Sequence, residues 1–551
     1  MIGVGARLDT PEPALRRVVE RMPFLSDRPV ESWRAPSGGV VAAWVQHDPH
    51  QVGGVRYAHA ERDRLALFAG RPIRWTGERE ADGRGALDPA SYLGGVPRDE
   101  LDGRCVVAMC DDARGVIDVV PDPVGAYPVY AIEHGGARWV SNCAAVLRAI
   151  GGVGDLDPRV LASVLGGGWS LSGDPVWASV ERTGAGFWPH GIASVIGAGL
   201  DPERAAPLLV AVVRALADWP GRPSFVPVTA GRDSRLVLAA GLAAGVSFEA
   251  ITGGDKGDPD VEVGLRLAAV AGVPHSLVPD DPHGSVWSDW RRAAEVLALT
   301  QGGTATLADA AGFPLGPRDG PLPIWHSGQG GEIARSYYGV GEGDVGDRLV
   351  RAFLGERPGR TGPLSEDGRE LVRDQIAGWV AQQLDAGIAA ADVPDMFYLQ
   401  RRMGTWAGPT HGAVEYVRDT TSPLWSARLL PDLLGAPAAD RARSAFHAQV
   451  LERLAPQLVD VPFERPPRLP RKLLRELRRR ALPRRHPGDP FAPILAEVRE
   501  LVLADTAHPA WSVLDRTRVE ALLTSAPGAL DTMSRYYVWR LATVFAGFPA
   551  R

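Results

Sequence analysis

The sequence predicts an α/β fold built from two domains, and three observations lead to that expectation. About the first 150 residues form short β-like runs separated by turns. From about residue 200, strand-like and helix-like segments alternate, which is typical of a parallel sheet with helices on its faces. At 551 residues, the chain is also too long for one ordinary domain.

The N-terminal part is expected to be rich in strands. Strand-like runs occur at residues 38–47, 64–70, 104–112, 115–122 and 127–142. In the last run, the stretch His134-Gly135-Gly136 is typical of a hairpin turn between two strands. The segment 151–191 is looser in composition, and we expect it to link the two domains.

The C-terminal part begins with the alternating region. Periodicity predicts helices at 202–219, 233–245 and 260–273, and strands at 224–230, 248–254 and 275–279. The remainder is expected to be mostly helical, with a polar, Pro/Arg-rich interruption near 462–490. No internal repeat is visible in the chain.

Composition narrows the class of protein. The net charge of −6 gives no global bias toward nucleic acid or an anionic membrane. The sequence has no apolar run long enough to span a bilayer and no signal-peptide core at its start, so we expect a soluble, cytoplasmic protein without a membrane partner. Three cysteines without CxxC spacing favour neither a disulfide framework nor a zinc site.

Lysine is scarce. Among 60 basic residues, only Lys256 and Lys472 are lysines, and the others are arginine. Lysine is a compact cation whose pKa can shift, whereas arginine stays charged and carries a broad fork. Each surviving lysine is therefore a candidate functional cation, with chance survival at an exposed position as the alternative.

The stretch Val228-Thr-Ala-Gly-Arg-Asp-Ser234 joins an expected strand to an expected helix. In a parallel sheet such a loop lies at the carboxyl edge, where backbone N–H groups and a helix N-terminus can bind an anion. Gly231 would allow close approach of an oxygen, and Asp233 suits this place if Mg²⁺ bridges it to phosphate. The alternative is that Asp233 caps the helix.

Four stretches occur in the order found in the asparagine synthetase family. "TAGRDSR" resembles the family's pyrophosphate loop, Ser-Gly-Gly-x-Asp-Ser, and "HSGQGGEIARSYYG" from His326 resembles its second loop. "DPDVEVGLRLAAVAGVPH" is similar to the helix that follows the adenine-binding strand, and "VEYVRDTTSPLW" is similar to a later Glu-x-Arg-x-Pro stretch.

The N-terminal part resembles the same family. "LDGRCVVAMCDD", "PDPVGAYPVYAIEHGGARWVSNCAAVL" and "VERTGAGFW" are similar to pieces of its glutaminase-like domain, so the resemblance covers roughly residues 50–470. It implies an Ntn-hydrolase-like αββα sandwich at 1–195 and an adenine-nucleotide α-hydrolase-like parallel α/β synthetase domain, of the ATP-pyrophosphatase type, at 196–551.

The resemblance also implies a reaction. Members of the family use ATP and Mg²⁺ to adenylate a carboxylate, releasing pyrophosphate and then AMP as an amine forms the amide. Here Met1 is followed by Ile2 and the first cysteine is Cys105, so the glutaminase nucleophile is missing and the N-terminal domain is expected to be a scaffold. Relatives of this kind include β-lactam synthetases and lasso-peptide cyclases.

We therefore expect an ATP-dependent carbon–nitrogen ligase that closes a ring in a peptide, as in a lasso-peptide macrolactam, or in a specialised metabolite. Its substrate would be a peptide or a small molecule. Intermolecular amidation with ammonia or an amine is one alternative. A catalytically degenerate nucleotide-binding scaffold is another, and the sequence leaves both open.

The resemblance implies the following site residues. Asp233 and Glu332 would bind Mg²⁺ and, with Lys472, carry catalysis. The nucleotide would be held by Val228, Thr229, Ala230, Gly231, Arg232, Asp233, Ser234, Thr252, Lys256, Ser327, Gly328, Gln329 and Gly330.

Three positions depart from the family pattern. Ala230 replaces a loop glycine, at a cost of about 1 kcal/mol if the residue needs a positive φ. Gln329 replaces an acidic residue, and Glu332 is one methylene longer than aspartate. The catalytic cation is also open, because Arg465 lies nearest to the family's lysine position, Lys472 follows seven residues later, and Lys256 is a third candidate.

The basic run at 465–485 is a candidate partner site. It is rich in arginine and would attract an anionic partner, such as RNA or an acidic peptide. The alternative is a solvated helix face, and the absence of interleaved aromatic residues argues against base stacking.

Overall fold

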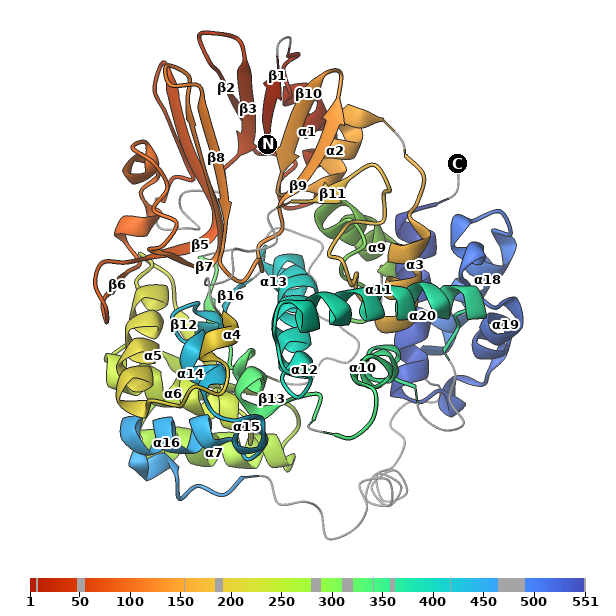
Figure 1. Ribbon diagram of the computed structural model, residues 1–551. Helices are drawn as coiled ribbons and strands as arrows, with labels where there is room; N and C mark the ends of the chain where they lie inside the picture. Colours follow the sequence, from red (N-terminus) through yellow and green to blue (C-terminus); the bar gives the residue numbers. More distant parts are fainter. Residues whose placement is uncertain are drawn as a thin grey trace.

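The computed structural model describes residues 1–5, 8–46, 55–152, 154–183, 192–278, 289–309, 321–339, 341–356, 362–416, 418–463 and 491–549. It contains two antiparallel sheets at one end and a parallel sheet with helices at the other (Figure 1). The predicted α/β class is therefore confirmed, and a parallel sheet is present in the region where strands and helices alternate.

The first antiparallel sheet has the strand order β11-β9-β10-β1-β3-β2. Its hairpin between β9 and β10 turns at Gly135 and Gly136, whose φ values of 63° and 73° lie in the left-handed region that glycine adopts freely. The strands are β1 (Ile2–Gly5), β2 (Val30–Arg34), β3 (Val40–Val45), β9 (Tyr130–His134), β10 (Ala137–Ser141) and β11 (Glu181–Arg182).

The second antiparallel sheet has the order β4-β5-β7-β8, with β6 paired to β5. Apolar residues of the two sheets, among them Ala42, Leu65 and Ala108, form one buried cluster, so the sheets pack face to face. The strands are β4 (Ala58–Ala60), β5 (Arg64–Trp75), β6 (Ala81–Asp82), β7 (Leu101–Asp111) and β8 (Val116–Pro121).

Different helices and turns contact the two antiparallel sheets. Helices α1 (Glu12–Val19) and α2 (Ala144–Gly151) pack on strands of the first sheet. The second sheet contacts two short 3₁₀ turns, η1 (Gly85–Leu87) and η2 (Pro89–Tyr92), and its strands β5 and β6 also contact helix α5 (Pro202–Ala217). Within the described residues, the α-helical contacts of the second sheet that an αββα sandwich would use are thus those of α5 with β5 and β6.

The parallel sheet has the order β14-β13-β12-β15-β16. The chain runs outward from β12 through β13 to β14, and then returns to the other side of β12 with β15. The strands are β12 (Ser224–Pro227), β13 (Glu249–Gly253), β14 (His275–Val278), β15 (Ile324–His326) and β16 (Asp419–Thr421).

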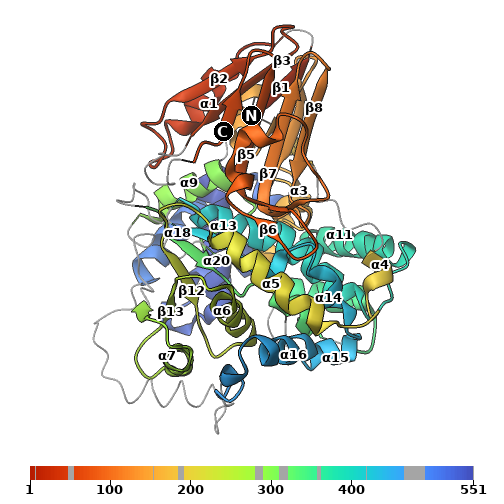
Figure 2. The same ribbon diagram turned by 90° about the vertical axis from the view of Figure 1, so that its left-hand side faces the viewer.

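The predicted helices of the alternating region are present. They are α5 (Pro202–Ala217), α6 (Arg232–Ala244) and α7 (Pro259–Ala271). Asp201 caps α5 by accepting hydrogen bonds from the Glu203 and Arg204 N–H groups, and α6 and α7 both end on a left-handed glycine. Figure 2 shows α5, α6 and α16 (Ala445–Leu454) on the same side of the molecule.

The rest of the chain is mostly helical, as predicted. Its longer helices include α9 (Trp290–Gln301), α10 (Val345–Leu354), α11 (Glu366–Asp385), α18 (Phe491–Ala504), α19 (Arg516–Thr524) and α20 (Thr532–Gly547). The shorter ones include α4 (Ile192–Val195), α12 (Val393–Phe397), α13 (Gly408–Val414), α14 (Leu430–Gly435) and α15 (Ala438–Ala442). Among the described residues, no helix is both long and apolar enough to cross a membrane.

The expected linker contains a buried helix. Helix α3 (Pro158–Gly167) begins at Asp157, whose side chain accepts a hydrogen bond from the Arg159 N–H, and buries most of its side chains. It packs against α11 and α20 of the C-terminal half rather than against the antiparallel sheets. Strand β11 then returns the chain to the first antiparallel sheet, where it pairs with β9.

Candidate functional site

Two loops lie side by side at the carboxyl edge of the parallel sheet. One follows β12 and the other follows β15, and these two strands pair with each other. Because the chain continues to β13 on one side and to β16 on the other, this is the point where the strand order reverses. Ligands of open parallel sheets bind at such a switch point.

The first loop, residues 228–234, is held largely by its own hydrogen bonds. The Ser234 Oγ accepts from the Thr229 N–H at 3.2 Å, and the Thr229 Oγ1 accepts from the Gly231 N–H at 3.1 Å. The Ala230 N–H donates to the Asp260 Oδ1 at 2.8 Å. Ala230 does not have a positive φ, so the strain considered for alanine at this position is absent.

The first turn of α6 is open to an anion. The residue at its N-cap is Gly231 and not Asp233, and no side chain caps the helix. Gly231 and Arg232 are exposed, while the Arg232 guanidinium lies 4.9 Å from the centre of the Phe463 ring. A free helix N-terminus with an arginine beside it favours a phosphate or a carboxylate.

The second loop, residues 327–332, packs directly on the first. A Cβ on Gly328 would lie 2.5 Å from the Ser234 nitrogen and 2.6 Å from the Asp233 carbonyl carbon. Gly330 has a φ of +103° and lies against the Trp425 ring. The glycines expected to approach a nucleotide therefore first allow the two loops to contact each other.

Polar side chains fix the second loop. The Ser327 N–H donates to the Thr421 carbonyl at 2.8 Å, and the Ser327 Oγ accepts from the Gln329 N–H at 3.1 Å. The Gln329 Oε1 lies 2.7 Å from the His411 Nε2. The amide at position 329 therefore has a neutral partner, since burial lowers the pKa of His411 well below its usual value.

Asp233 and Glu332 both form ion pairs with the guanidinium of Arg335. The Arg335 Nη2 lies 2.7 Å from the Asp233 Oδ2 and 3.7 Å from the Glu332 Oε1. The two acids that the sequence singled out are thus close together, but a cation of the chain itself lies between them.

Both carboxylates have further partners. The His447 Nε2 lies 2.6 Å from the Asp233 Oδ1, and because an ionised carboxylate only accepts, this nitrogen donates. The Glu332 Oε2 accepts from the Gly330 N–H at 3.0 Å and from the Tyr398 hydroxyl at 2.8 Å. Burial, together with the nearby Glu332, raises the pKa of Tyr398 well above its usual value and keeps it a neutral donor.

These contacts do not fit a resident Mg²⁺. The ion needs free carboxylate oxygens at about 2.1 Å in an octahedral arrangement. Both Asp233 oxygens have a donor, and Arg335 lies where a shared metal would have to be. The described part of the chain contains no group of three or more His, Cys, Asp or Glu side chains placed to hold a metal ion.

A π-helix borders the two loops. The segment η4 (Tyr398–Ala407) is a π-helix, a rare form that occurs often at functional sites. It carries Tyr398 and Arg402, and the Arg402 guanidinium lies 4.1 Å from the Trp406 ring centre and 4.8 Å from the Tyr337 ring centre. No carboxylate of a described residue pairs with Arg402, although its Nε is buried without an acceptor.

The remaining predicted residues lie apart from this contact. Val228 is fully buried, and its carbonyl accepts from the Thr252 Oγ1 at 2.8 Å. The Thr252 hydroxyl also lies 2.9 Å from the His275 Nε2, so it belongs to the interior of the sheet. Lys256 is exposed in the turn between β13 and α7. Lys472, Arg465 and the basic run at 465–485 lie outside the described residues.

Sequence reasoning missed Arg335, His447, Tyr398 and Arg402. Arg335 follows Glu332 by three residues on the short helix η3 (Gly331–Arg335), a spacing that favours an ion pair and could have been noticed. The other three come from segments distant in the chain, and no local pattern marks them.

Comparisons with protein-family models and with curated proteins found no match to this chain.

Proposed function

We propose that this protein is an ATP-dependent ligase that activates a substrate carboxylate as an acyl-adenylate and directs an amine onto it to form an amide. In the first step, a carboxylate oxygen attacks the α-phosphorus of ATP and pyrophosphate leaves. In the second, the amine attacks the acyl carbon, AMP leaves and the amine loses a proton.

One observation carries this proposal. The loops after β12 and β15 meet at the switch point of a parallel sheet and bring Asp233, Glu332 and Arg335 together. Such a point is the usual place for a nucleotide in this class of sheet. The two loops are also the two whose residues resemble those of the asparagine synthetase family.

The residues at this place supply mainly positive charge and positioning. The N-terminus of α6, Arg232 and Arg335 would neutralise the pyrophosphate as it leaves. Asp233 and Glu332 orient Arg335, and His447 holds Asp233 in turn. Since these carboxylates are occupied, we propose that Mg²⁺ enters as part of the substrate Mg·ATP.

Arg402 is the candidate residue for binding the carboxylate of the acid substrate. It lies on the π-helix beside Tyr398, whose hydroxyl donates to Glu332, and it has no carboxylate partner among the described residues. A guanidinium flanked by aromatic rings binds a carboxylate strongly, because water competes poorly there.

The amine is proposed to come from the substrate or from solution and not from a glutaminase reaction. Burial raises the pKa of the Cys105 thiol well above its usual value and that of Cys110 to about 12. Burial also raises the pKa of Cys143, whose thiol donates to the Leu299 carbonyl. None of the three cysteines thus offers a thiolate near neutral pH.

The finer form of the proposal is ring closure within a peptide, as in a lasso-peptide macrolactam, or within a specialised metabolite. The lack of a reactive thiol supports an amine that is already part of the substrate. We propose with it that the two antiparallel sheets are a degenerate Ntn-hydrolase-like domain and that the parallel sheet is an adenine-nucleotide α-hydrolase-like synthetase domain.

A second candidate is a scaffold without catalysis, and the occupied carboxylates favour it. Titration calorimetry of the full chain with Mg·ATP separates the two. The ligase predicts saturable binding that weakens at least tenfold in Asp233→Asn and not in Asp255→Asn, an exposed acid in the neighbouring turn. Absence of ATP binding to the wild type would refute the ligase and favour the scaffold.

A further inference from the structure

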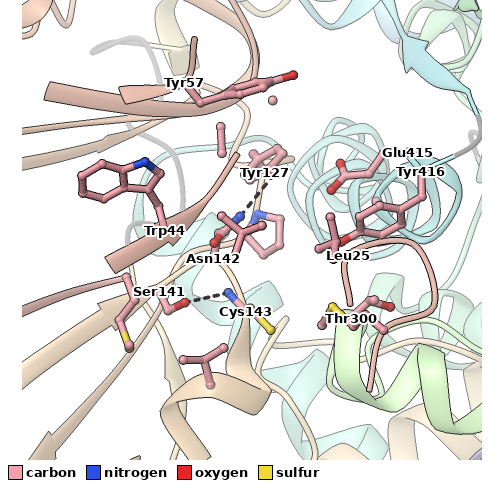
Figure 3. A pocket seen from close by; sticks show the side chains of 18 of the residues that line it. Leu25, Trp44, Tyr57, Tyr127, Ser141, Asn142, Cys143, Thr300, Glu415 and Tyr416 are labelled. Carbon is pink, nitrogen blue, oxygen red and sulfur yellow. Dashed lines mark hydrogen bonds between the residues drawn. The ribbon is translucent and has the colours of Figure 1, made fainter. Parts of the chain in front are cut away.

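A cavity of about 210 Å³ lies between the antiparallel sheets and the C-terminal half of the chain. Figure 3 shows side chains from both parts around it, with Trp44, Tyr57 and Asn142 on one side and Glu415 and Tyr416 on the other. It shares no residue with the loops after β12 and β15, so the proposed ligase reaction does not account for it.

One wall of the cavity is apolar. Leu15, Val18 and Val19 of α1 line it together with Met22 and Val146, and each of these side chains is otherwise buried. This wall suits an aliphatic or aromatic body, because burying it would remove apolar surface from water.

The opposite wall carries a polar side chain without a partner. Gln301 is 6% exposed, and its carboxamide forms no hydrogen bond with another described residue. A Cβ added at Gly412 would lie 3.1 Å from the Gln301 Oε1 and 3.2 Å from its Nε2, so a larger residue at position 412 would crowd the amide. Nearby, the Asn142 Nδ2 donates to the Tyr127 hydroxyl at 3.3 Å. A buried amide without a partner costs free energy unless a ligand satisfies it.

The lining also holds two arginines with N–H groups that lack an acceptor in the described part of the chain. Arg104 pairs with Glu415 at 3.2 Å, while Arg71 and Arg222 both pair with Asp419, at 2.8 and 2.9 Å. Arg104, Arg222, Glu415 and Asp419 line the cavity, whereas Arg71 does not, and the Nε atoms of Arg104 and Arg222 are buried without an acceptor among the described residues. Burial also raises the pKa of Glu415, which favours its neutral form beside Arg104. A buried N–H donor without an acceptor is costly, and a carboxylate oxygen of a ligand would accept from it.

We propose that this cavity binds a small organic monocarboxylate, with its carboxylate against Arg104 and Gln301 and its apolar body against α1. The geometry of the two walls requires both parts of the ligand. An inorganic anion would leave the apolar wall unfilled, and a hydrocarbon without a carboxylate would leave the N–H donors of the arginines without an acceptor.

The direct test is titration calorimetry of the full chain with 3-phenylpropanoate and 3-phenylpropanamide, in the absence of ATP. The two compounds have nearly the same shape and differ in charge. We expect the acid to bind and the amide to bind at least tenfold more weakly. Equal binding of the two, or binding of neither, would overturn the proposal.

Variants locate the binding. Val18→Trp fills the cavity and is expected to abolish binding of the acid, whereas Val116→Trp, at a position 41% exposed on β8, leaves it unchanged. Gln301→Leu leaves no charge unpaired, so the chain should fold and the acid should bind at least tenfold more weakly. Unchanged affinity in both Val18→Trp and Gln301→Leu would show that the acid binds elsewhere and would contradict the proposal.

The test is independent of the ligase proposal. Asp233→Asn lies outside the cavity, and its affinity for the acid should equal that of the wild type. In the wild type, acid binding without ATP binding would refute the ligase alone, and ATP binding without acid binding would refute the cavity proposal alone.

Discussion

Arg335 decides the electrostatics at the meeting point of the two loops. Without it, Asp233 and Glu332 would face each other and repel, and no phosphate would be attracted there. A guanidinium held by two carboxylates loses little conformational freedom when it binds a phosphate oxygen, which is the property a preorganised site needs.

We therefore expect Arg335→Gln to weaken ATP binding at least tenfold, because the substitution removes a charge-assisted hydrogen bond worth about 1.5–3 kcal/mol. Competition with a fluorescent ATP analogue measures the change. The control is Arg351→Gln on α10, an exposed arginine. Equal ATP affinity in Arg335→Gln and in the control would show that Arg335 has only a structural role.

Arg402 leads to a different expectation. If it holds the acid, Arg402→Gln should raise the KM for the acid at least tenfold and leave the affinity for ATP unchanged. The measurement is the rate of pyrophosphate release against acid concentration. A parallel loss of ATP affinity would instead show that Arg402 has a structural role in holding the two loops.

At the scale of elements, local patterns predicted much of the fold. The alternation of β12, α6, β13 and α7 follows from apolar periodicity together with caps and glycine ends, which are properties of neighbouring residues. Helix α3 was missed because glycine and proline flank it, and tertiary burial against α11 and α20 is what stabilises it. The π-helix could not be predicted, since its extra residue per turn depends on packing.

The residues of the candidate site were likewise predicted only in part from the sequence. The loops holding Asp233 and Glu332 could be located from the chain, because a resemblance marked them. Their partners could not: His447 lies 214 residues after Asp233 and Tyr398 lies 66 residues after Glu332. Only the folded chain brings these side chains together, so the engagement of both carboxylates had no signal in the sequence.

The packing of the second loop on the first gives an element-scale prediction. Gly328→Ala would place a Cβ against the backbone of Asp233 and Ser234, and should destabilise the protein by about 1–3 kcal/mol and lower ATP affinity. Gly378→Ala is the control, since this glycine lies in α11 with open space around its Cβ, and it should be neutral or slightly stabilising. Chemical denaturation and ATP titration of both variants measure the difference, and equal behaviour would contradict the close packing of the loops.

At the scale of the whole molecule, buried histidines link stability to pH. His326 is 1% exposed between β12 and β16, and burial, with the nearby Arg71, lowers its pKa from 6.5 to about 3. The unfolded chain therefore binds a proton below about pH 6.5 that the folded chain does not. Stability conferred by the neutral imidazole is present above pH 6.5 and is lost as the pH falls toward 3.

We expect the urea concentration at the denaturation midpoint to decrease when the pH is lowered from 7.5 to 5. The decrease should be smaller in His326→Gln, which keeps a hydrogen-bonding side chain but does not titrate. Urea denaturation at both pH values measures the two differences. An equal fall in the variant would assign the pH dependence to other groups, among them His411, whose pKa burial also lowers.

The central claim is that the loops after β12 and β15 serve the activation of a carboxylate by ATP. The most direct measurement incubates the full chain with Mg·ATP, a panel of carboxylic acids and hydroxylamine, and identifies the nucleotide product and any hydroxamate. The account predicts AMP, pyrophosphate and a hydroxamate in equal amounts, all lost in Asp233→Asn. Release of ADP and phosphate, or of AMP without a hydroxamate for any acid, would contradict it.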